Sequence, residues 1–243
     1  MPTFETEAIV LRAIRFSEAD SILSLLTFQR GRVSAIAKGA RRPKSRLGGR
    51  LQPGVRVHLT LHEGRGDVHG IRGAALVEPN AGLWADSYRL LAASAVLETA
   101  MRALPEHEPS DGAYHLTTRA LGLLARTSPR QRPPRLDPLV LGYRTKLLVA
   151  IGFLPQLSGC VSCGGDVAST AFSARLGGTL CDDCAGVADQ VGHPVLAALR
   201  QLLGAPLADA EPMDQGVAEG VEHLIGEVLL EHLGVALKSA ASR

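Results

Sequence analysis

The sequence has few of the features that mark membrane and secreted proteins. No apolar run approaches the roughly 18 residues that a membrane-spanning helix needs, so an integral membrane protein is excluded. The N-terminal residues are acidic and contain no apolar signal core, so we expect no secretion. Aromatic residues are scarce, at 4% of the chain. Up to position 80 there are only Phe4, Phe16 and Phe28, which are as typical of a core as of a stacking surface.

The common catalytic motifs are also missing. There is no P-loop, no Gly-x-Ser-x-Gly, and no His-x-Glu paired with Pro-Cys-x-x-Cys. The acidic residues of positions 1–80 are scattered, which does not indicate a two-metal nuclease cluster. We therefore expect a binding protein rather than an enzyme, and predict no catalytic residues.

Acidic residues are absent from one long stretch. The 243 residues include 26 Lys and Arg against 24 Asp and Glu, a net charge of +2. No acid stands between Asp20 and Glu63, where nine Lys and Arg do. Arg outnumbers Lys 22 to 4, as a GC-rich genome would produce, but that bias does not explain the missing acids. Such asymmetry indicates a polyanionic partner, the alternative being an ordinary solvated face.

The charge imbalance runs along the whole chain. The net charge is +6 over 1–80 (13 basic, 7 acidic), +3 over 81–159 (9 and 6), −2 over 160–184 (1 and 3) and −5 over 185–243 (3 and 8). We interpret the acid-free stretch as a nucleic-acid-binding surface. Its predicted contacts are Arg32, Lys38, Arg41, Arg42, Lys44, Arg46 and Arg50. The next candidates are Arg126, Arg130, Arg132 and Arg135.

Hydrophobic periodicity predicts strands first and helices afterwards. Alternation and short apolar runs predict five strands near 7–14, 21–28, 33–38, 55–61 and 68–77, enough for a small closed barrel. A polar, basic segment at 39–53 is too long for a simple turn and indicates function. Helical spacing then predicts helices over 82–103, 111–126, 138–153, 193–204 and 216–237, with Asp111 as an N-cap.

All four cysteines fall within 25 residues. Cys160 and Cys163 are followed after 17 residues by Cys181 and Cys184, which is a spacing typical of structural zinc. Four cysteine ligands leave no open coordination position, so we expect one structural Zn²⁺ rather than a catalytic one. The alternative is free or redox cysteines, but the flanking segments do not form the βαβ context of a thioredoxin. Metal binding could fold a segment too short to bury a core.

Several motifs resemble those of a known family. They are Ala8-Ile9-Val10-Leu11-Arg12, Ser17-Glu18-Ala19-Asp20-Ser21-Ile22-Leu23, Gly31-Arg32-Val33, Ala37-Lys38-Gly39-Ala40-Arg41-Arg42-Pro43-Lys44-Ser45-Arg46 and Leu51-Gln52-Pro53. With the helical middle and the cysteine pairs, they resemble the bacterial DNA repair and recombination mediator family RecO along nearly the whole chain. One departure is Gly54, where members of that family often carry an aromatic residue, and not every member keeps all four cysteines.

The resemblance implies an α+β protein of three domains that occupy four segments of the chain. These are an N-terminal five-stranded OB-fold β-barrel over 1–80, an α-helical domain over 81–159 and 185–243, and an inserted four-cysteine zinc module over 160–184. It further implies binding of single- and double-stranded DNA, annealing of complementary strands, and partnership with RecR and single-strand DNA-binding protein in loading RecA. The expected place of action is the cytoplasm, in association with the nucleoid.

Two other functions fit the residues alone. An RNA-binding accessory protein could share an OB-fold and a zinc module, and it would not be expected to anneal complementary DNA without ATP. An interaction scaffold would use the acidic end, residues 185–243, to dock a partner, and its basic face would be incidental. Competition by heparin or single-stranded DNA for that partner would distinguish the scaffold.

Overall fold

The computed structural model describes residues 2–45, 47–64, 66–166, 170–186 and 188–240. The chain divides into two compact units, Met1–Pro129 and Arg130–Arg243, which we call the N-terminal and C-terminal units. Among the described residues, no helix combines the length and the apolar character that crossing a membrane requires.

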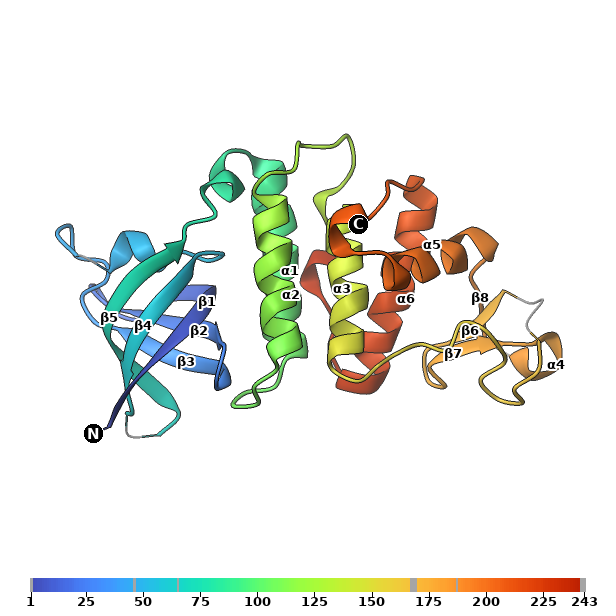
Figure 1. Cartoon of the computed structure of the whole chain (residues 1–243), viewed down its shortest axis with the longest axis horizontal. Coiled ribbons are helices and arrows are strands. Elements are labelled where there is room, and N and C mark those ends of the chain that lie inside the picture. The colour runs from blue at the N-terminus through green and yellow to red at the C-terminus, as the bar shows by residue number, and fades with distance from the viewer. Residues whose placement is uncertain (1, 46, 65, 167–169, 187, 241–243) are drawn as a thin grey trace. The chain divides into compact units, whose positions relative to one another are not determined.

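Five strands form a closed barrel in the N-terminal unit (Figure 1). They are β1 (Thr3–Arg15), β2 (Ser21–Thr27), β3 (Gly31–Ala37), β4 (Arg56–His62) and β5 (Val68–Glu78). Around the barrel the order is β1-β2-β3-β5-β4, and only the β3–β5 pair is parallel. A small five-stranded barrel closed in this way is the OB-like architecture, so the predicted fold class is confirmed.

Strict alternation along β3 and β4 directs every second side chain into the barrel core. On β3, Val33, Ala35 and Ala37 are buried while Ser34 and Ile36 are half-exposed. Successive side chains of a strand point to opposite faces, so one residue of each pair enters the core. The inner face is completed by Ala8, Val10, Leu23, Leu25, Val57, Leu59, Leu61 and Ile71.

Two glycines are required by the backbone of this unit. Gly31 opens β3 with φ +64°, and a Cβ there would lie 2.1 Å from the carbonyl oxygen of Glu108. Gly54 has φ +86°, donates its N–H to Val10 O at 2.8 Å and accepts from the side-chain amide of Asn80 at 2.8 Å. An aromatic residue at position 54 would therefore be strained in this chain, whatever other sequences carry.

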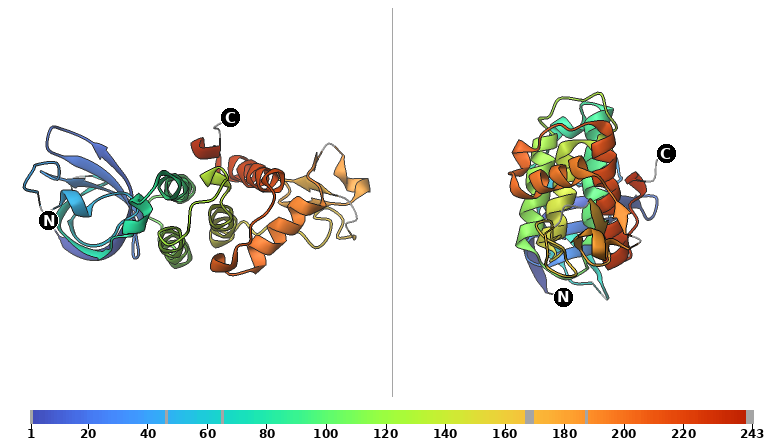
Figure 2. Two further views of the ribbon diagram at one scale, coloured as in Figure 1. Left: turned by 90° about the horizontal axis from the view of Figure 1, so that it is seen from above. Right: turned by 90° about the vertical axis from the view of Figure 1, so that its right-hand side faces the viewer.

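Two helices complete the N-terminal unit, α1 (Ser87–Ala103) and α2 (Asp111–Leu124). Helix α1 contacts β1 and β2, and α2 lies beside α1 (Figure 2). The predicted start at residue 82 is wrong, because Ala81–Trp84 is a separate 3₁₀ turn and Asp86 caps α1 by accepting from Arg89 N at 2.8 Å.

The prediction of Asp111 as N-cap is also wrong. Ser110 holds that position, and its Oγ accepts from Ala113 N at 3.3 Å. Asp111 is the first helical residue, where its charge favours the positive end of the helix dipole. Both residue types are good N-caps, so the sequence alone did not separate them.

Three longer helices and a small sheet form the C-terminal unit. The helices α3 (Pro138–Ala150), α5 (His193–Gly204) and α6 (Gln215–Leu233) pack against one another. The sheet contains β6 (Ala171–Ser173), β7 (Gly178–Leu180) and β8 (Asp189–Gln190), in the order β7-β6-β8, with the short helix α4 (Asp182–Ala185) after β7. The remaining 3₁₀ turns of the chain are Gly48–Arg50, Pro134–Leu136, Leu207–Asp209 and Lys238–Ala240.

The last helix is shorter than the predicted range 216–237. It ends at Leu233 because Gly234 adopts the left-handed conformation, with φ +64°, and its N–H donates to Leu230 O at 3.0 Å. Glycine tolerates this C-terminal cap without a Cβ clash. The apolar spacing of Val235 and Leu237 continues past the cap and misled the prediction.

Candidate nucleic-acid interface and metal centre

Most of the predicted DNA contacts lie on one loop between β3 and β4, residues 38–50, which we call the basic loop. Its first half is a succession of tight turns: Arg42 N donates to Gly39 O at 3.1 Å, and Ser45 N donates to Arg42 O at 2.9 Å. A 3₁₀ turn at Gly48–Arg50 ends it. The functional loop that the sequence predicts at 39–53 is thus held by its own backbone hydrogen bonds.

Three hydrogen bonds attach the basic loop to the turn between β1 and β2. Gly39 N donates to Asp20 Oδ1 at 2.8 Å, Arg41 N donates to Ala19 O at 2.9 Å, and the Arg41 guanidinium donates to Ser17 O at 2.9 Å. A hollow of about 310 Å³ lies between strands β1 and β2 and the loop, lined by Ala13 and Ser21 of the strands and by Ala40 and Arg41 of the loop. The carboxylate of Asp20 is thus engaged by the backbone of the basic loop.

Five predicted contacts in the described part of the basic loop are exposed: Lys38, Arg41, Arg42, Lys44 and Arg50. Arg50 donates to Ala74 O at 3.0 Å. Among the described residues, no carboxylate forms an ion pair with any of these five. The loop therefore presents positive charge that the fold does not neutralise. Arg46 lies outside the described residues.

Arg32 is placed differently from the other predicted contacts. It lies on β3, with only 20% of its side chain exposed. Its Nε donates to Leu104 O at 3.0 Å, and its Nη1 pairs with Glu106 Oε1 at 2.8 Å. The guanidinium thus joins the barrel to the segment after α1.

The second set of candidate arginines is also partly engaged within the fold. Arg130 Nε lies 3.6 Å from Asp137 Oδ2, and Arg135 pairs with Glu222. Arg126 is exposed on the surface of the N-terminal unit. Arg130, Arg132 and Arg135 are only half-exposed, so this set presents less exposed charge than residues 38–50.

The aromatic residues near the barrel differ in exposure. Phe4 packs edge-on against His69, with centroids 5.3 Å apart, and Arg30 lies 3.6 Å above its ring. Phe28 contacts Tyr114 and His115 edge-on, at 5.4 and 5.5 Å. Phe16, in contrast, is 61% exposed at the end of β1. The sequence did not distinguish it, although its polar neighbours Arg15, Ser17 and Glu18 are the signal of a turn rather than of a core.

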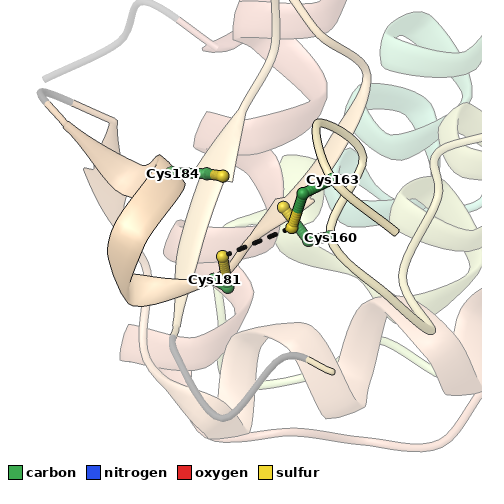
Figure 3. A group of neighbouring side chains, drawn as sticks. All are labelled: Cys160, Cys163, Cys181 and Cys184. Atoms are coloured by element: carbon green, nitrogen blue, oxygen red, sulfur yellow. Dashed lines mark hydrogen bonds between the residues drawn. The ribbon is translucent and has the colours of Figure 1, made fainter. Parts of the chain in front are cut away.

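The four cysteines of the C-terminal unit converge on one point (Figure 3). Their sulfur atoms all lie within 4.8 Å of one another, and Sγ of Cys163 and Sγ of Cys181 are 3.7 Å apart. Metal–sulfur distances of about 2.3 Å in a tetrahedral site give sulfur–sulfur edges of about 3.8 Å. The cluster therefore has the donor set and the spacing to bind a metal ion.

Backbone amides face the sulfur atoms of the cluster. Hydrogen bonds from the amides of Cys181 and Cys163 lower the pKa of Cys160 to about 6. The neighbouring thiols of Cys181 and Cys163 raise the pKa of Cys184 to about 12. Amide donors favour a thiolate, whereas crowded sulfurs oppose a second one unless a cation lies between them.

The segment around the cysteines has very little core of its own. Among the described residues, the buried cluster around the cysteines consists of Cys160, Ala171 and Leu180. Backbone bonds of Gln156 with Gly177 and Thr179, each 2.9 Å, join the connection after α3 to the β6–β7 hairpin, and Arg200 on α5 donates to Leu157 O at 2.7 Å. So few buried residues cannot offset the conformational entropy lost when the loops are ordered. The binding free energy of a metal ion would supply the additional stabilisation.

Comparison with known proteins places both units in one family. The family model described as Recombination protein O N terminal matches residues 1–80, and Recombination protein O C terminal matches residues 85–241. A DNA repair protein RecO of Nocardioides sp. is 38% identical over 248 aligned positions, covering 98% of each chain. Those of Rubrobacter xylanophilus (34%, covering 96% of this chain and 93% of the relative) and Bifidobacterium animalis subsp. lactis (41%, covering 74% of each) are also similar. The chain, with its five-stranded barrel, its basic loop and its cysteine cluster, belongs to the recombination protein O (RecO) family.

Proposed function

We propose that this chain is a non-enzymatic recombination mediator in DNA repair. It binds single- and double-stranded DNA, anneals complementary strands, and with RecR helps to load RecA on DNA covered by single-strand DNA-binding protein. In this proposal residues 1–80 are the nucleic-acid-binding domain, residues 81–159 and 185–243 are the helical domain, and residues 160–184 are the metal module. The chain would act in the cytoplasm at the nucleoid.

The observation that carries the proposal is the charge of the basic loop. Lys38, Arg41, Arg42, Lys44 and Arg50 are exposed on a loop that the barrel holds in place, and no described carboxylate pairs with them. A fixed array of cations binds phosphates without losing much conformational freedom, and it carries no means of reading base edges. We leave Arg32 out of the proposed contacts because its guanidinium is occupied by Leu104 and Glu106.

The salt dependence of binding tests this mechanism. Each neutralised phosphate of a single strand contributes about −0.7 to the slope of log K against log salt, so five contacts predict about −3.5. Replacing Lys38, Arg42 and Lys44 together by Ala should weaken binding and reduce the slope to about −1.4. The matched control replaces three exposed arginines of the same unit, Arg72, Arg119 and Arg126.

A strand-annealing assay with the same loop and control variants tests the proposed activity. The wild-type chain should anneal complementary DNA strands without ATP, and the loop variant should lose this activity while the control keeps it. A chain that binds RNA but anneals no DNA would instead be an RNA-binding accessory protein. If the control weakens DNA binding and the loop variant does not, the interface includes Arg72, Arg119 or Arg126 rather than the basic loop.

We also propose that Cys160, Cys163, Cys181 and Cys184 hold one Zn²⁺. Four thiolates at tetrahedral spacing suit zinc, and they leave no position for substrate or water. When bound, the ion would cross-link the loop after α3 to the segment from β7 to α4. Its role is therefore to stabilise this part of the C-terminal unit, and no chemistry on DNA is assigned to it.

A further inference from the structure

Phe16 is the exposed aromatic residue nearest in the chain to the hydrogen-bonded turn beside the basic loop. It directly precedes Ser17, whose carbonyl accepts from the Arg41 guanidinium at 2.9 Å, and its own N–H donates to Asp20 O at 3.2 Å. The turn is therefore closed, and the backbone at Phe16 is held. Yet 61% of the residue is open to solvent. Single exposed apolar residues are common on protein surfaces, so the significance of Phe16 depends on what lies beside it.

The surroundings of Phe16 are apolar and positively charged. Ile14 is 41% exposed and pairs with Ile22, which in turn pairs with Ile36, so the three form a half-exposed row across β1, β2 and β3. Arg12 and Arg15, on the same end of β1, are exposed as well. Paired positions of neighbouring strands share one face of a sheet, so this row is a continuous apolar strip.

The charges around the turn favour a nucleic acid strand as the partner. The basic loop, which is hydrogen-bonded to the turn at Ser17, Ala19 and Asp20, supplies cations for phosphates beside it. Glu18, exposed in the turn itself, would repel phosphates there. A strand with its phosphates on the loop would place its bases, rather than its backbone, toward the turn.

We propose that Phe16 is a stacking residue for an unpaired base of single-stranded DNA. This rests on the proposed function, since the phosphates of the same strand are assigned to the basic loop. Single strands are bound by combining a basic track with aromatic rings on which bases stack, and the ring makes no distinction between bases. Bases of an intact duplex are stacked within it and cannot reach the ring, so the contact also favours single over double strands.

The test compares Phe16→Ala, Phe16→Leu and Phe16→Trp in binding to an oligo(dT) strand and to a duplex of equal length. Losing a base–aromatic stack should weaken single-strand affinity about 5- to 150-fold in the Ala variant. Leu keeps apolar bulk without a π-face and should also weaken binding, whereas Trp should retain it. Duplex affinity should change by less than about twofold.

The salt slope separates this contact from the basic loop. Phe16 carries no charge, so Phe16→Ala should lower affinity equally at every salt concentration and leave the slope unchanged. If the loop variant reduces the slope while Phe16→Ala leaves affinity unchanged, the stacking proposal is overturned and the proposed function stands. If neither variant alters binding, the proposed function fails with it.

A direct optical signal is also available. The chain has a single tryptophan, Trp84. In a Trp84→Phe background, Phe16→Trp places the only indole at the proposed contact. Stacking on a base should quench its fluorescence when oligo(dT) is added, and addition of the duplex should leave it unchanged. Unchanged emission with a fully bound single strand would overturn the assignment.

Discussion

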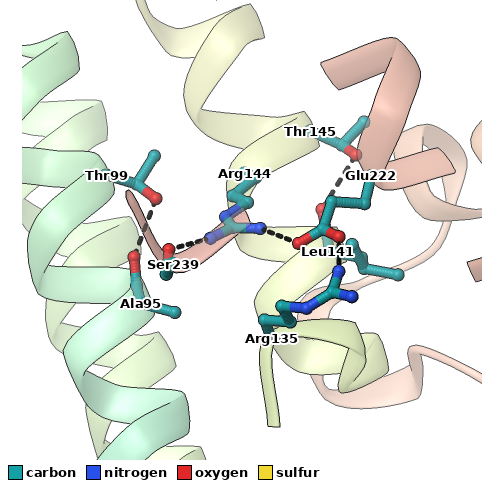
Figure 4. Close-up of polar contacts among 8 residues, drawn as sticks. All are labelled: Ala95, Thr99, Arg135, Leu141, Arg144, Thr145, Glu222 and Ser239. Atoms are coloured by element: carbon teal, nitrogen blue, oxygen red, sulfur yellow. Dashed lines mark hydrogen bonds and ion pairs between the residues drawn. The ribbon is translucent and has the colours of Figure 1, made fainter. Parts of the chain in front are cut away.

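Arg144 on α3 and Glu222 on α6 form an ion pair inside the C-terminal unit, with 3.0 Å between Nη1 and Oε1 (Figure 4). Neither side chain is more than 7% exposed. The other carboxylate oxygen of Glu222 pairs with Arg135, and Arg144 Nη2 donates to Ser239 Oγ at 2.7 Å. One carboxylate thus compensates two guanidinium groups and joins α6, α3 and the 3₁₀ turn before α3.

Removing that carboxylate should destabilise the C-terminal unit strongly. In Glu222→Gln, the fully buried Arg144 and the mostly buried Arg135 would lose the carboxylate that they share, and breaking a buried pair typically costs about 3–5 kcal/mol. Urea unfolding followed by circular dichroism measures the change, and hydrogen exchange in α3 and α6 assigns it to this unit. Glu231→Gln, exposed on the same helix, is the control and should stay within about 0.5 kcal/mol of wild type. Equal effects of the two variants would contradict the prediction.

Removal of metal should unfold only the cysteine segment. Cys160→Ser should reduce bound zinc from about one ion per chain to well below it, because a closed tetrahedral site needs all four thiolates. The buried cluster around Cys160, Ala171 and Leu180 is too small to hold residues 156–190 in its absence. Amide protection there should therefore collapse, while the barrel remains protected.

The control for the cysteine variant is Asp166→Asn, an exposed change of similar size in the same segment. This variant should keep both its bound zinc and the protection of its amides from hydrogen exchange. Elemental analysis measures the zinc bound per chain, and hydrogen exchange measures the protection of the amides. Full zinc content in Cys160→Ser, or full protection after metal is removed from wild type, would refute a stabilising metal site.

Tyr114 should make the N-terminal unit sensitive to alkaline pH. Its hydroxyl donates to Glu7 Oε2 at 3.3 Å, and burial together with the negative charge of Glu7 raises the pKa of Tyr114 to about 12. Because the folded state keeps a proton that the unfolded state releases near pH 10, this stability is complete below pH 10 and falls as the pH rises toward 12. Tyr114→Phe keeps the ring contact with Phe28 and should flatten that fall.

Unfolding in urea at about pH 9 and about pH 11 provides the comparison for Tyr114. Wild type should lose more stability between the two values than Tyr114→Phe. An identical loss in both proteins would mean that the hydroxyl of Tyr114 titrates no later in the folded chain than in the unfolded one.

The barrel could be predicted because its signal is local. Alternation on 33–38 and 55–61 specifies which side chains face inward, and the structure places Val33, Ala35, Val57 and Leu59 there. The clustering of the cysteines could also be predicted, because the spacing of the two pairs is typical of a site in which two turns meet at one point. The wrong predictions concern the ends of helices. Whether Ser110 or Asp111 caps α2, for example, depends on a single hydrogen bond.

The parts that could not be predicted depend on contacts between distant residues. Nothing local shows that Arg32 is paired with Glu106, or that Arg135 faces Glu222, because each partner is far along the chain. By charge alone Arg32 is equivalent to Arg42, yet one guanidinium is engaged by the fold and the other is exposed. A count of basic residues therefore overestimates the surface available to DNA.

This difference between Arg32 and Arg42 is itself testable. Arg32→Ala should destabilise the N-terminal unit by about 1–2 kcal/mol, because it removes two charge-assisted hydrogen bonds from a side chain that is only 20% exposed. Arg42→Ala should leave stability within about 0.5 kcal/mol of wild type, since the side chain is exposed.

DNA binding should separate the same two variants in the opposite sense. Arg42→Ala should weaken single-strand affinity and reduce the salt slope by about 0.7, the contribution of one phosphate contact. Arg32→Ala should keep the wild-type slope, measured at a temperature where it is fully folded. A loss of slope in Arg32→Ala would mean that its guanidinium leaves Glu106 for a phosphate when DNA binds, and the basic surface would then extend from the loop onto β3.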